Sequence, residues 1–403
     1  MADLSVEVAG VRFKNPFMVA SAEPTESFDK MKRAIDKGAG SVISKSYSSL
    51  KEMQDQTNIS KFGWYGYDRR PAYGKDIPEF WTAFSRTGMI QMPEDDWMEE
   101  MRRTVEYAKK HDAVVVGSVA GHAEHSETVR LAKKIEQTGV PMIEIDLGCP
   151  QVEQMEEKGA LAKRGEEYFE RAEALTKVLN VPLIVKLSPQ QVDLVETSKG
   201  VRERGGAAGV TCLNRFLGFM PDPETAKPVW WTFGGTGGPW MLPISLRWCA
   251  KIYLEMPDFP ILGSNGPVNW EDMVRFHLAG ATCVEFCSVI MLKGYSVVSE
   301  IINGLNSYLD RKGYKSVKEI IGVAARAAYS YSELYTLPDY QEKSVIDEDL
   351  CIRCGKCSEV CWYDAIETDE EELASSIEEK CKGCRNCMVI CPVPGCVTMK
   401  TVG

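Results

Sequence analysis

The chain has 403 residues, of which 44% are hydrophobic and 26% are charged, and its formal net charge is −11. This composition indicates a globular protein of two or three domains and excludes a disordered chain. The acidic balance argues against a nucleic-acid or anionic-membrane partner, and we expect neither a secretory leader nor an apolar membrane span of about 18 residues.

From residue 17 to about residue 330, short apolar segments alternate with longer amphipathic segments. Such alternation predicts a parallel sheet whose strands are joined by crossover helices. Eight strand–helix units over roughly 300 residues favour an α/β fold of the closed (β/α)8 TIM-barrel type, and an open doubly wound sheet is the alternative. The expected strands are 17–21, 41–46, 114–120, 142–148, 183–188, 209–214, 261–265 and 283–288, with helices at 126–137, 168–179, 270–278 and 296–308.

Functional side chains of a barrel lie where its strands end. The ends after the seventh and eighth strands, 263–266 and 287–288, contain glycine, serine and cysteine. Small residues there let backbone N–H groups approach a phosphate, although tight-turn geometry alone explains the glycines equally well. Polar residues at other expected strand ends are Lys45, Asp146, Lys186 and Asn214.

Nine of the 14 cysteines lie in the last 53 residues, and eight of them form two runs with identical spacing. This spacing is typical of bacterial dicluster ferredoxins, in which three thiolates of a run hold one 4Fe–4S cluster and the fourth reaches the neighbouring cluster. A zinc site, with four ligands per metal in paired cysteines, is the alternative. Cys396 lies outside both runs, and we expect it to be a small core residue. The expected ligand sets are Cys351, Cys354, Cys357 and Cys391 for one cluster, and Cys361, Cys381, Cys384 and Cys387 for the other.

The uneven cysteine distribution predicts a barrel domain over 1–335, a linker over 336–346 and a small α+β ferredoxin domain over 347–403. Cysteine-rich metal centres fit a reducing compartment, so we expect a cytoplasmic protein. The acidic segment 367–379 is interpreted as a solvated loop, and docking of a basic electron-transfer partner is the alternative.

Several segments carry a family resemblance: 15–22, 147–150, 186–189 and 287–288 in the body, followed by the two cysteine runs. The body resembles the dihydroorotate dehydrogenase-type flavin barrels. The whole chain resembles the large iron–sulfur flavoprotein subunits of bacterial NAD-dependent dihydropyrimidine dehydrogenases. The similarity covers nearly all 403 residues, and the order of barrel and dicluster domain is more specific than either part.

The resemblance implies a bound FMN above the barrel mouth. Ala20 and Ser21 would lie near the flavin, Lys45 near both flavin and substrate, and Lys186 at the N1/O2 edge, where charge accumulates on reduction. A surface position for either lysine is the alternative. Residues implied along the ribityl and phosphate path are Gly235, Gly263, Ser264, Asn265, Gly266, Cys287 and Ser288.

Cys149 matches the proton donor and acceptor of the family. The chemistry needs a hydride at one carbon and a proton at the adjacent carbon, and a thiol within hydrogen-bonding reach can serve as that acid. The alternative is a buried cysteine that packs as a small hydrophobe. The charged segment 153–159 that follows is interpreted as a lid over the pocket.

The substrate residues depart from the family pattern. Asn214 is kept, but an expected Asn before the cysteine motif is Asp146, one on the third-strand loop aligns with Thr82, and a Thr after Asn214 is Arg215. An ionised Asp146 only accepts hydrogen bonds, whereas Arg215 offers five donors and a fixed charge. The two could pair and leave specificity unchanged, or Arg215 could bind a substrate carboxylate.

Three hypotheses follow. The first is an FMN and iron–sulfur oxidoreductase that reduces an activated C=C bond of the uracil or thymine type. The second keeps the cofactors but takes a carboxylated, aromatic or thioester-linked enoate, and the third is an electron-transfer subunit with an inactive barrel. The chain has no Gly-x-Gly-x-x-Gly between a strand and a helix, so we expect an NAD(P)- or FAD-binding partner subunit, or a ferredoxin, as electron donor, and an oligomeric assembly.

Overall fold

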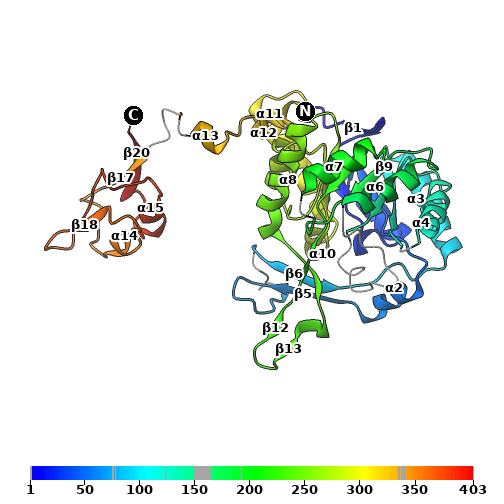
Figure 1. The fold of residues 1–403 in the computed structure, drawn as a ribbon, viewed down its shortest axis with the longest axis horizontal. Coiled ribbons are helices and arrows are strands. Elements are labelled where there is room, and N and C mark those ends of the chain that lie inside the picture. The colour runs from blue at the N-terminus through cyan, green and yellow to red at the C-terminus, as the bar shows by residue number, and fades with distance from the viewer. Residues whose placement is uncertain are drawn as a thin grey trace. The chain divides into compact units, whose positions relative to one another are not determined.

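The structure, a computed structural model, describes residues 2–74, 77, 79–122, 124–148, 165–191, 193–334, 336 and 342–402. The chain divides into two compact units, Met1–Arg326 and Ala327–Gly403. The first is coloured blue to yellow in Figure 1, and the second orange and red. In the described part of the chain, no helix is both long enough and apolar enough to cross a bilayer.

Eight parallel strands close into a barrel in the first unit, each paired with the next along the chain, and the last strand pairs with the first. Val284 pairs with Phe17 at this closure. The closed barrel is confirmed, and the open sheet is excluded. The eight expected segments supply all eight strands, β3 (Phe17–Val19), β4 (Ser41–Ile43), β7 (Val114–Ala120), β8 (Met142–Asp146), β9 (Leu183–Lys186), β10 (Gly209–Cys212), β15 (Ile261–Gly263) and β16 (Cys283–Phe286).

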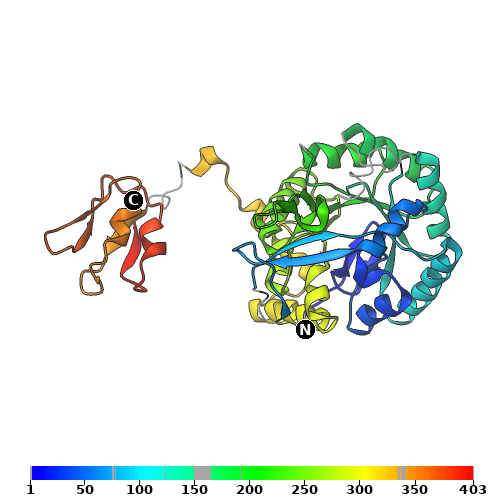
Figure 2. The ribbon, with the colours of Figure 1, turned by 90° about the horizontal axis from the view of Figure 1, so that it is seen from below.

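Amphipathic helices surround the barrel as an outer ring (Figure 2). Their apolar faces pack on the strands, and polar N-caps begin several of them: Ser27 accepts a hydrogen bond from the Lys30 N–H, and Asn269 from the Asp272 N–H. The longer helices are α1 (Phe28–Asp36), α3 (Glu94–Lys110), α4 (His125–Glu136), α6 (Gly165–Thr176), α7 (Leu194–Glu203), α8 (Leu242–Glu255), α9 (Trp270–Leu278) and α11 (Ser296–Lys312).

Short helical turns connect these elements. They are η1 (Glu23–Thr25), α2 (Lys51–Asp55), η2 (Gln56–Ile59), η4 (Val229–Trp231), η5 (Pro239–Met241), α10 (Ser288–Lys293), η6 (Val317–Ile320) and α12 (Val323–Arg326). A further short helix, α13 (Tyr331–Leu334), belongs to the second unit.

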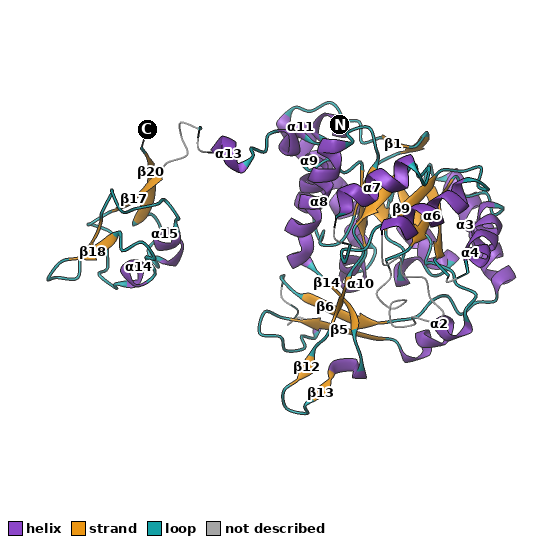
Figure 3. Cartoon of the chain, in the orientation of Figure 1, coloured by secondary structure: helices purple, strands orange, loops and turns teal. Residues whose placement is uncertain are grey.

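A four-stranded antiparallel sheet lies at one end of the barrel (Figure 3). It joins β5 (Lys61–Tyr65), β6 (Thr82–Arg86), β11 (Phe216–Gly218) and β14 (Gly234–Gly237) in the order β11-β14-β6-β5. The sequence did not predict it, because these strands are three to five residues long and pair across gaps of up to 154 residues, as at Gly237↔Ala83. We call this element the mouth sheet. Two further hairpins are β1 (Val6–Val8) with β2 (Val11–Phe13), and β12 (Pro221–Asp222) with β13 (Lys227–Pro228).

The second unit has the ferredoxin-like architecture expected after the barrel. Two antiparallel pairs of strands flank two short helices, and each cysteine run leads into one of the helices. Four cluster cysteines are partly buried against a small core of Ile366, Ala374, Val397, Cys387 and Cys396. The elements are β17 (Glu342–Ile346), α14 (Lys356–Glu359), β18 (Ile366–Thr368), β19 (Ala374–Ser376), α15 (Asn386–Ile390) and β20 (Val397–Thr401).

Candidate active site at the barrel mouth

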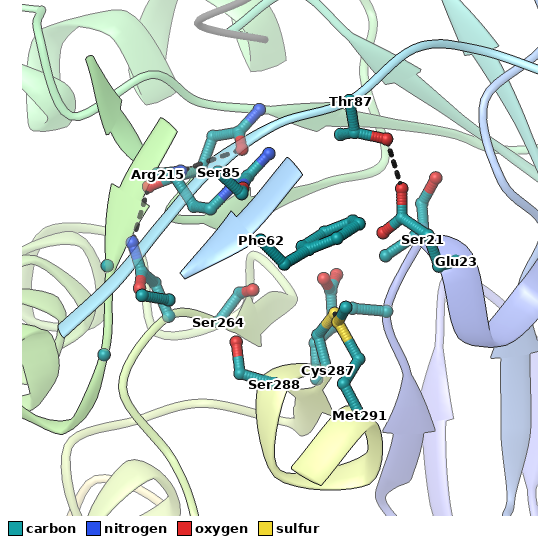
Figure 4. Close-up of a pocket in the computed structure, with 18 of the residues that line it drawn as sticks. Ser21, Glu23, Phe62, Ser85, Thr87, Arg215, Ser264, Cys287, Ser288 and Met291 are labelled. Carbon is teal, nitrogen blue, oxygen red and sulfur yellow. Dashed lines mark hydrogen bonds between the residues drawn. The ribbon is translucent and has the colours of Figure 1, made fainter. Parts of the chain in front are cut away.

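A cavity of about 1160 Å³, measured with its opening to solvent, lies between the strand ends of the barrel and the mouth sheet. Figure 4 shows it with the ring of Phe62 pointing toward its middle, Arg215 beside Ser85, and Ser264 near Ser288. The cavity therefore collects residues that are far apart in the sequence. Twelve of the candidate residues line it: Ala20, Ser21, Lys45, Asp146, Lys186, Asn214, Arg215, Ser264, Asn265, Gly266, Cys287 and Ser288.

Three other candidates lie just outside this lining. Gly263 faces the ring of Phe276, which a Cβ at this position would approach to 2.3 Å. Gly235 lies against the Arg215 guanidinium, 2.8 Å from where its Cβ would be, so that it makes room for this side chain. Thr82 pairs with Tyr65 in the mouth sheet. Cys149 and the segment 153–159 lie outside the described residues.

Lys186 rises from the end of β9 into the floor of the cavity. Its Nζ lies 3.1 Å from Glu285 Oε2 and 3.4 Å from Glu144 Oε1, and all three side chains are buried. Burial alone would lower the pKa of Lys186, but the two carboxylates outweigh it and raise that pKa above its usual value. Lys186 is therefore a cation held at the cavity floor.

Sequence reasoning missed Glu144 and Glu285. Burial raises the pKa of Glu285 to about 7, against the opposing effect of Lys186. Each acid stands between apolar neighbours inside a strand, Met-Ile-Glu-Ile-Asp in β8 and Cys-Val-Glu-Phe in β16. A buried acid is rare unless it is paired, so this pattern is the signal that could have found them.

Lys45 is held on the other side of the cavity by Glu23, which the sequence reasoning also missed. Its Nζ lies 2.9 Å from Glu23 Oε1 and 3.6 Å from Glu26 Oε2. The Thr87 hydroxyl donates to the same Glu23 oxygen at 2.6 Å. Burial would raise the pKa of Glu23, but Lys45 and Thr87 outweigh it and lower that pKa, so Glu23 is a carboxylate.

The candidate substrate residues form a chain along the cavity wall. Asn214 Nδ2 donates to Asp146 Oδ1 at 3.0 Å, and the Arg215 N–H donates to Asn214 Oδ1 at 2.8 Å. The Arg215 guanidinium donates to Ser85 Oγ of the mouth sheet. Burial raises the pKa of Asp146. Asp146 and Arg215 form no ion pair, and no carboxylate among the described residues pairs with Arg215, so the direct pairing that would cancel the two charges does not occur.

Aromatic rings of the mouth sheet form part of the cavity lining. Phe62 and Trp64 of β5 contribute together with Trp81, which directly precedes β6, and Trp64 meets Trp81 edge-on with ring centroids 5.0 Å apart. Trp231 lies outside the lining, since it is 70% exposed and its ring stacks on the Arg86 guanidinium.

The lining fits FMN in its chemistry. Two buried lysines, Lys186 and Lys45, can face an electron-rich ring. Hydroxyl and amide side chains follow the seventh and eighth strands, and Asn265 and Gly266 turn the chain there with φ of 67° and 112°. Phosphate sites of barrels are commonly built at this place.

The C-terminal unit contains two cavities of about 310 and 340 Å³, each lined by four thiols of the cysteine runs. Cys361 lines the cavity of the second run and Cys391 that of the first, which is the exchange expected for a dicluster ferredoxin. In the described ranges no three His, Cys, Asp or Glu side chains converge on a single metal ion. Thiols spread around a cavity suit a four-iron cubane better than one zinc ion. Cys396 also lines the first-run cavity.

Comparison with known proteins adds the family. The family pattern described as "Dihydroorotate dehydrogenase" matches residues 3–309, and the pattern described as "4Fe-4S dicluster domain" matches residues 344–399. The dihydroorotate dehydrogenase family binds FMN, and the dicluster domain indicates two 4Fe–4S clusters, so both cofactor predictions are confirmed.

Two curated relatives cover different shares of the chain. The NAD-dependent dihydropyrimidine dehydrogenase subunit PreA of Escherichia coli is 26% identical over 417 residues, which cover 99% of this chain and 96% of PreA. The catalytic subunit of dihydroorotate dehydrogenase B (NAD(+)) of Pyrococcus abyssi is 30% identical over 331 residues, which cover 80% of this chain and 99% of that subunit.

Both relatives are dehydrogenases, and the prediction of an enzyme that acts on a CH–CH group is confirmed against that of an inactive barrel. The barrel, its cavity and the attached dicluster unit thus place the chain in the dihydroorotate dehydrogenase family, as a flavin and iron–sulfur oxidoreductase.

Proposed function

We propose that this enzyme interconverts a CH–CH bond and a conjugated C=C bond in a substrate that carries a carboxylate next to that bond. Orotate and dihydroorotate are one such pair, and acyclic, aromatic or thioester-linked enoates with a carboxylate are others. The observation that supports this proposal is Arg215, a cation in the cavity wall with no carboxylate partner among the described residues. A planar guanidinium binds a carboxylate through two parallel hydrogen bonds.

The surroundings of Arg215 support this role. Gly235 leaves room for the guanidinium, and Ser85 accepts one of its hydrogen bonds, so the side chain is fixed and keeps further donors. Asp146 on the same wall can accept a hydrogen bond from a ring N–H, which suits a pyrimidine acid. Phe62 can pack against a planar substrate.

The remaining roles belong to the same proposal. Bound FMN supplies hydride transfer at N5. Cys149 would hold the proton for the adjacent carbon. Lys186 and Lys45 would orient the ring, and the ligand sets Cys351, Cys354, Cys357, Cys391 and Cys361, Cys381, Cys384, Cys387 would hold the clusters that relay electrons. A partner subunit that binds NAD(P) and FAD, or a ferredoxin, would supply these electrons in a cytoplasmic oligomer.

The test compares orotate, uracil, thymine and carboxylated enoates as substrates of the anaerobic enzyme with an artificial electron donor. We expect R215T to lower kcat/KM for the carboxylated substrate by about 10- to 100-fold, since a hydrogen bond to a charged group contributes about 1.5–3 kcal/mol. R215K keeps the charge but loses the planar pair of donors, so its kcat/KM should lie between those of the wild type and R215T. As a control, R86K changes an arginine that stacks on Trp231 outside the cavity.

A second candidate is reduction of uncharged uracil or thymine. The similarity to Escherichia coli PreA over 99% of the chain, dicluster unit included, favours it. Turnover of uracil that R215T leaves unchanged would establish this candidate and remove the carboxylate proposal.

A further inference from the structure

Glu144, Thr211 and Glu285 form a closed group under Lys186, inside the barrel. Thr211 Oγ1 lies 2.6 Å from Glu144 Oε2 and 3.1 Å from Glu285 Oε1. The second oxygen of each acid contacts Lys186 Nζ. Glu144 and Thr211 are fully buried, and Glu285 is 1% exposed.

The hydrogen bonds of this group cannot all form if both acids are ionised. A threonine hydroxyl has one proton to donate, and an ionised carboxylate only accepts. Thr211 can therefore donate to only one of the two acids. Its hydroxyl oxygen would then face an oxygen of the other ionised acid with no proton between the two acceptors. If one acid keeps its proton, that acid donates to Thr211 Oγ1 while Thr211 donates to the second acid. The network then closes.

The charges lead to the same result. Two carboxylates and one ammonium leave a net charge of −1 on side chains that are at most 5% exposed, which is costly because a buried charge needs a partner. One proton makes the group neutral. The raised pKa of Glu285 agrees with this count.

We propose that Glu144 and Glu285 share one proton through Thr211, and that this proton balances negative charge at the flavin edge that Lys186 faces. Glu144 and Glu285 are thus positioning residues, which act through Lys186. The second half of this inference rests on the proposed function, because it takes the flavin N1/O2 edge to lie at Lys186. A negative charge above Lys186 favours the protonated pair, so the pair should bind its proton more tightly when the flavin is reduced.

Few other titratable groups face the pair. Asp146 lies two residues after Glu144 on β8, and Cys283 and Cys287 lie two residues before and after Glu285 along the chain. Cys212 of β10 interacts with Cys249 of α8. The strands β3, β4, β7 and β15 contribute no titratable side chain. The shared proton is therefore assigned to Glu144 and Glu285 and not to one of these neighbours.

The first test uses flavin-free protein, so it does not depend on the substrate or the cofactor. We expect the infrared spectrum at neutral pH to contain the C=O band of a buried protonated carboxyl, which both E285Q and E144Q abolish. E255Q is the matched control, because Glu255 also pairs with a lysine, Lys199, but at the surface. Absence of the band from the wild type, or its persistence in both variants, would overturn the shared proton.

The second test measures the midpoint potential of bound FMN against pH. We expect the slope of the wild type to change where the pair takes up its proton on reduction, and E285Q to lose this change because its amide donates to Thr211 but cannot ionise. If E285Q does not fold, E144Q and T211V test the same network. An infrared band in the wild type, together with a slope that is the same in these variants as in the wild type, would keep the shared proton but refute its coupling to the flavin.

Discussion

The ionisable groups of the barrel unit are fixed by one another, whereas the thiols of the C-terminal unit line cavities in its own core. Around Lys186 and Lys45, carboxylates and hydroxyls stand within hydrogen-bonding distance, and a continuous apolar core surrounds the barrel. In the C-terminal unit, Cys387 and Cys396 belong to a core that otherwise consists of Ile366, Ala374 and Val397. Contacts between its own side chains stabilise the barrel unit, whereas the C-terminal unit has a small core whose cysteines would be joined by metal.

The contrast indicates that the C-terminal unit depends on its cofactor for folding and that the barrel unit does not. Small domains with few buried apolar residues need metals or cross-links, and metal binding then contributes directly to folding free energy. The barrel has the core of a large domain and orders its site by hydrogen bonds. We therefore expect the stability of the two units to respond differently to removal of the cofactor, to removal of a charged partner and to acid pH.

The largest effect is expected on removing iron. Anaerobic chelation of the full-length protein should unfold the C-terminal unit and leave the barrel unit folded. Limited proteolysis with mass spectrometry should then detect cleavage within 342–402 and a stable fragment near 1–326. Protection of 342–402 after complete iron loss would show that this unit folds without clusters.

Two cysteines of one cavity provide the matched pair for this experiment. Cys391 and Cys396 both line the first-run cavity, but only Cys391 belongs to a run. We expect C391A to lose the iron of one cluster and C396A to keep both, as measured by iron content and electron paramagnetic resonance. Equal iron loss in the two variants would contradict the ligand assignment.

The sequence predicted the barrel well because its strands are buried on both faces and are thus continuous apolar runs. It predicted the dicluster unit because the ligands of a cluster stand at a local spacing. The mouth sheet was not predicted because its strands pair residues that are far apart in the sequence, such as Gly235 and Ser85. Glu144 and Glu285 were not predicted because Lys186, the partner that makes their burial possible, lies on another strand.

The next largest effect is expected at Lys186. K186M leaves Glu144 and Glu285 buried without their cation, and breaking a buried ion pair in this way costs about 3–5 kcal/mol. The thermal midpoint of the barrel unit should fall at pH 7, and K186M/E285Q should recover part of the loss, because the two sites share one network. K199M, at a surface lysine paired with Glu255, is the control and should have little effect. Equal losses in K186M and K199M would show that the buried group contributes no more to folding than the surface pair does.

The smallest effect concerns acid stability, and it should be confined to the barrel unit because all four histidines of the chain lie there. His277 is fully buried in α9, with Nδ1 2.9 Å from the Ala281 carbonyl oxygen, so Nδ1 carries the proton. Its Nε2 is buried without a partner. Burial lowers the pKa of His277 to about 4, which keeps the ring neutral in the folded state.

Because the folded pKa lies below the usual 6.5, the unfolded chain binds the proton more readily. Stability from this group is present above pH 6.5 and is lost as pH falls toward 4, by at most about 3 kcal/mol. H277N keeps a donor for Ala281 but cannot ionise, so its barrel unfolding should lose the part of the pH dependence that the wild type has between 6.5 and 4. H111N, at an exposed histidine, should retain that dependence. Parallel curves for wild type and H277N would mean that Nε2 finds an acceptor when protonated. The acid sensitivity of the barrel would then have to come from its carboxylates or from His122 and His125, whose pKa values burial also lowers.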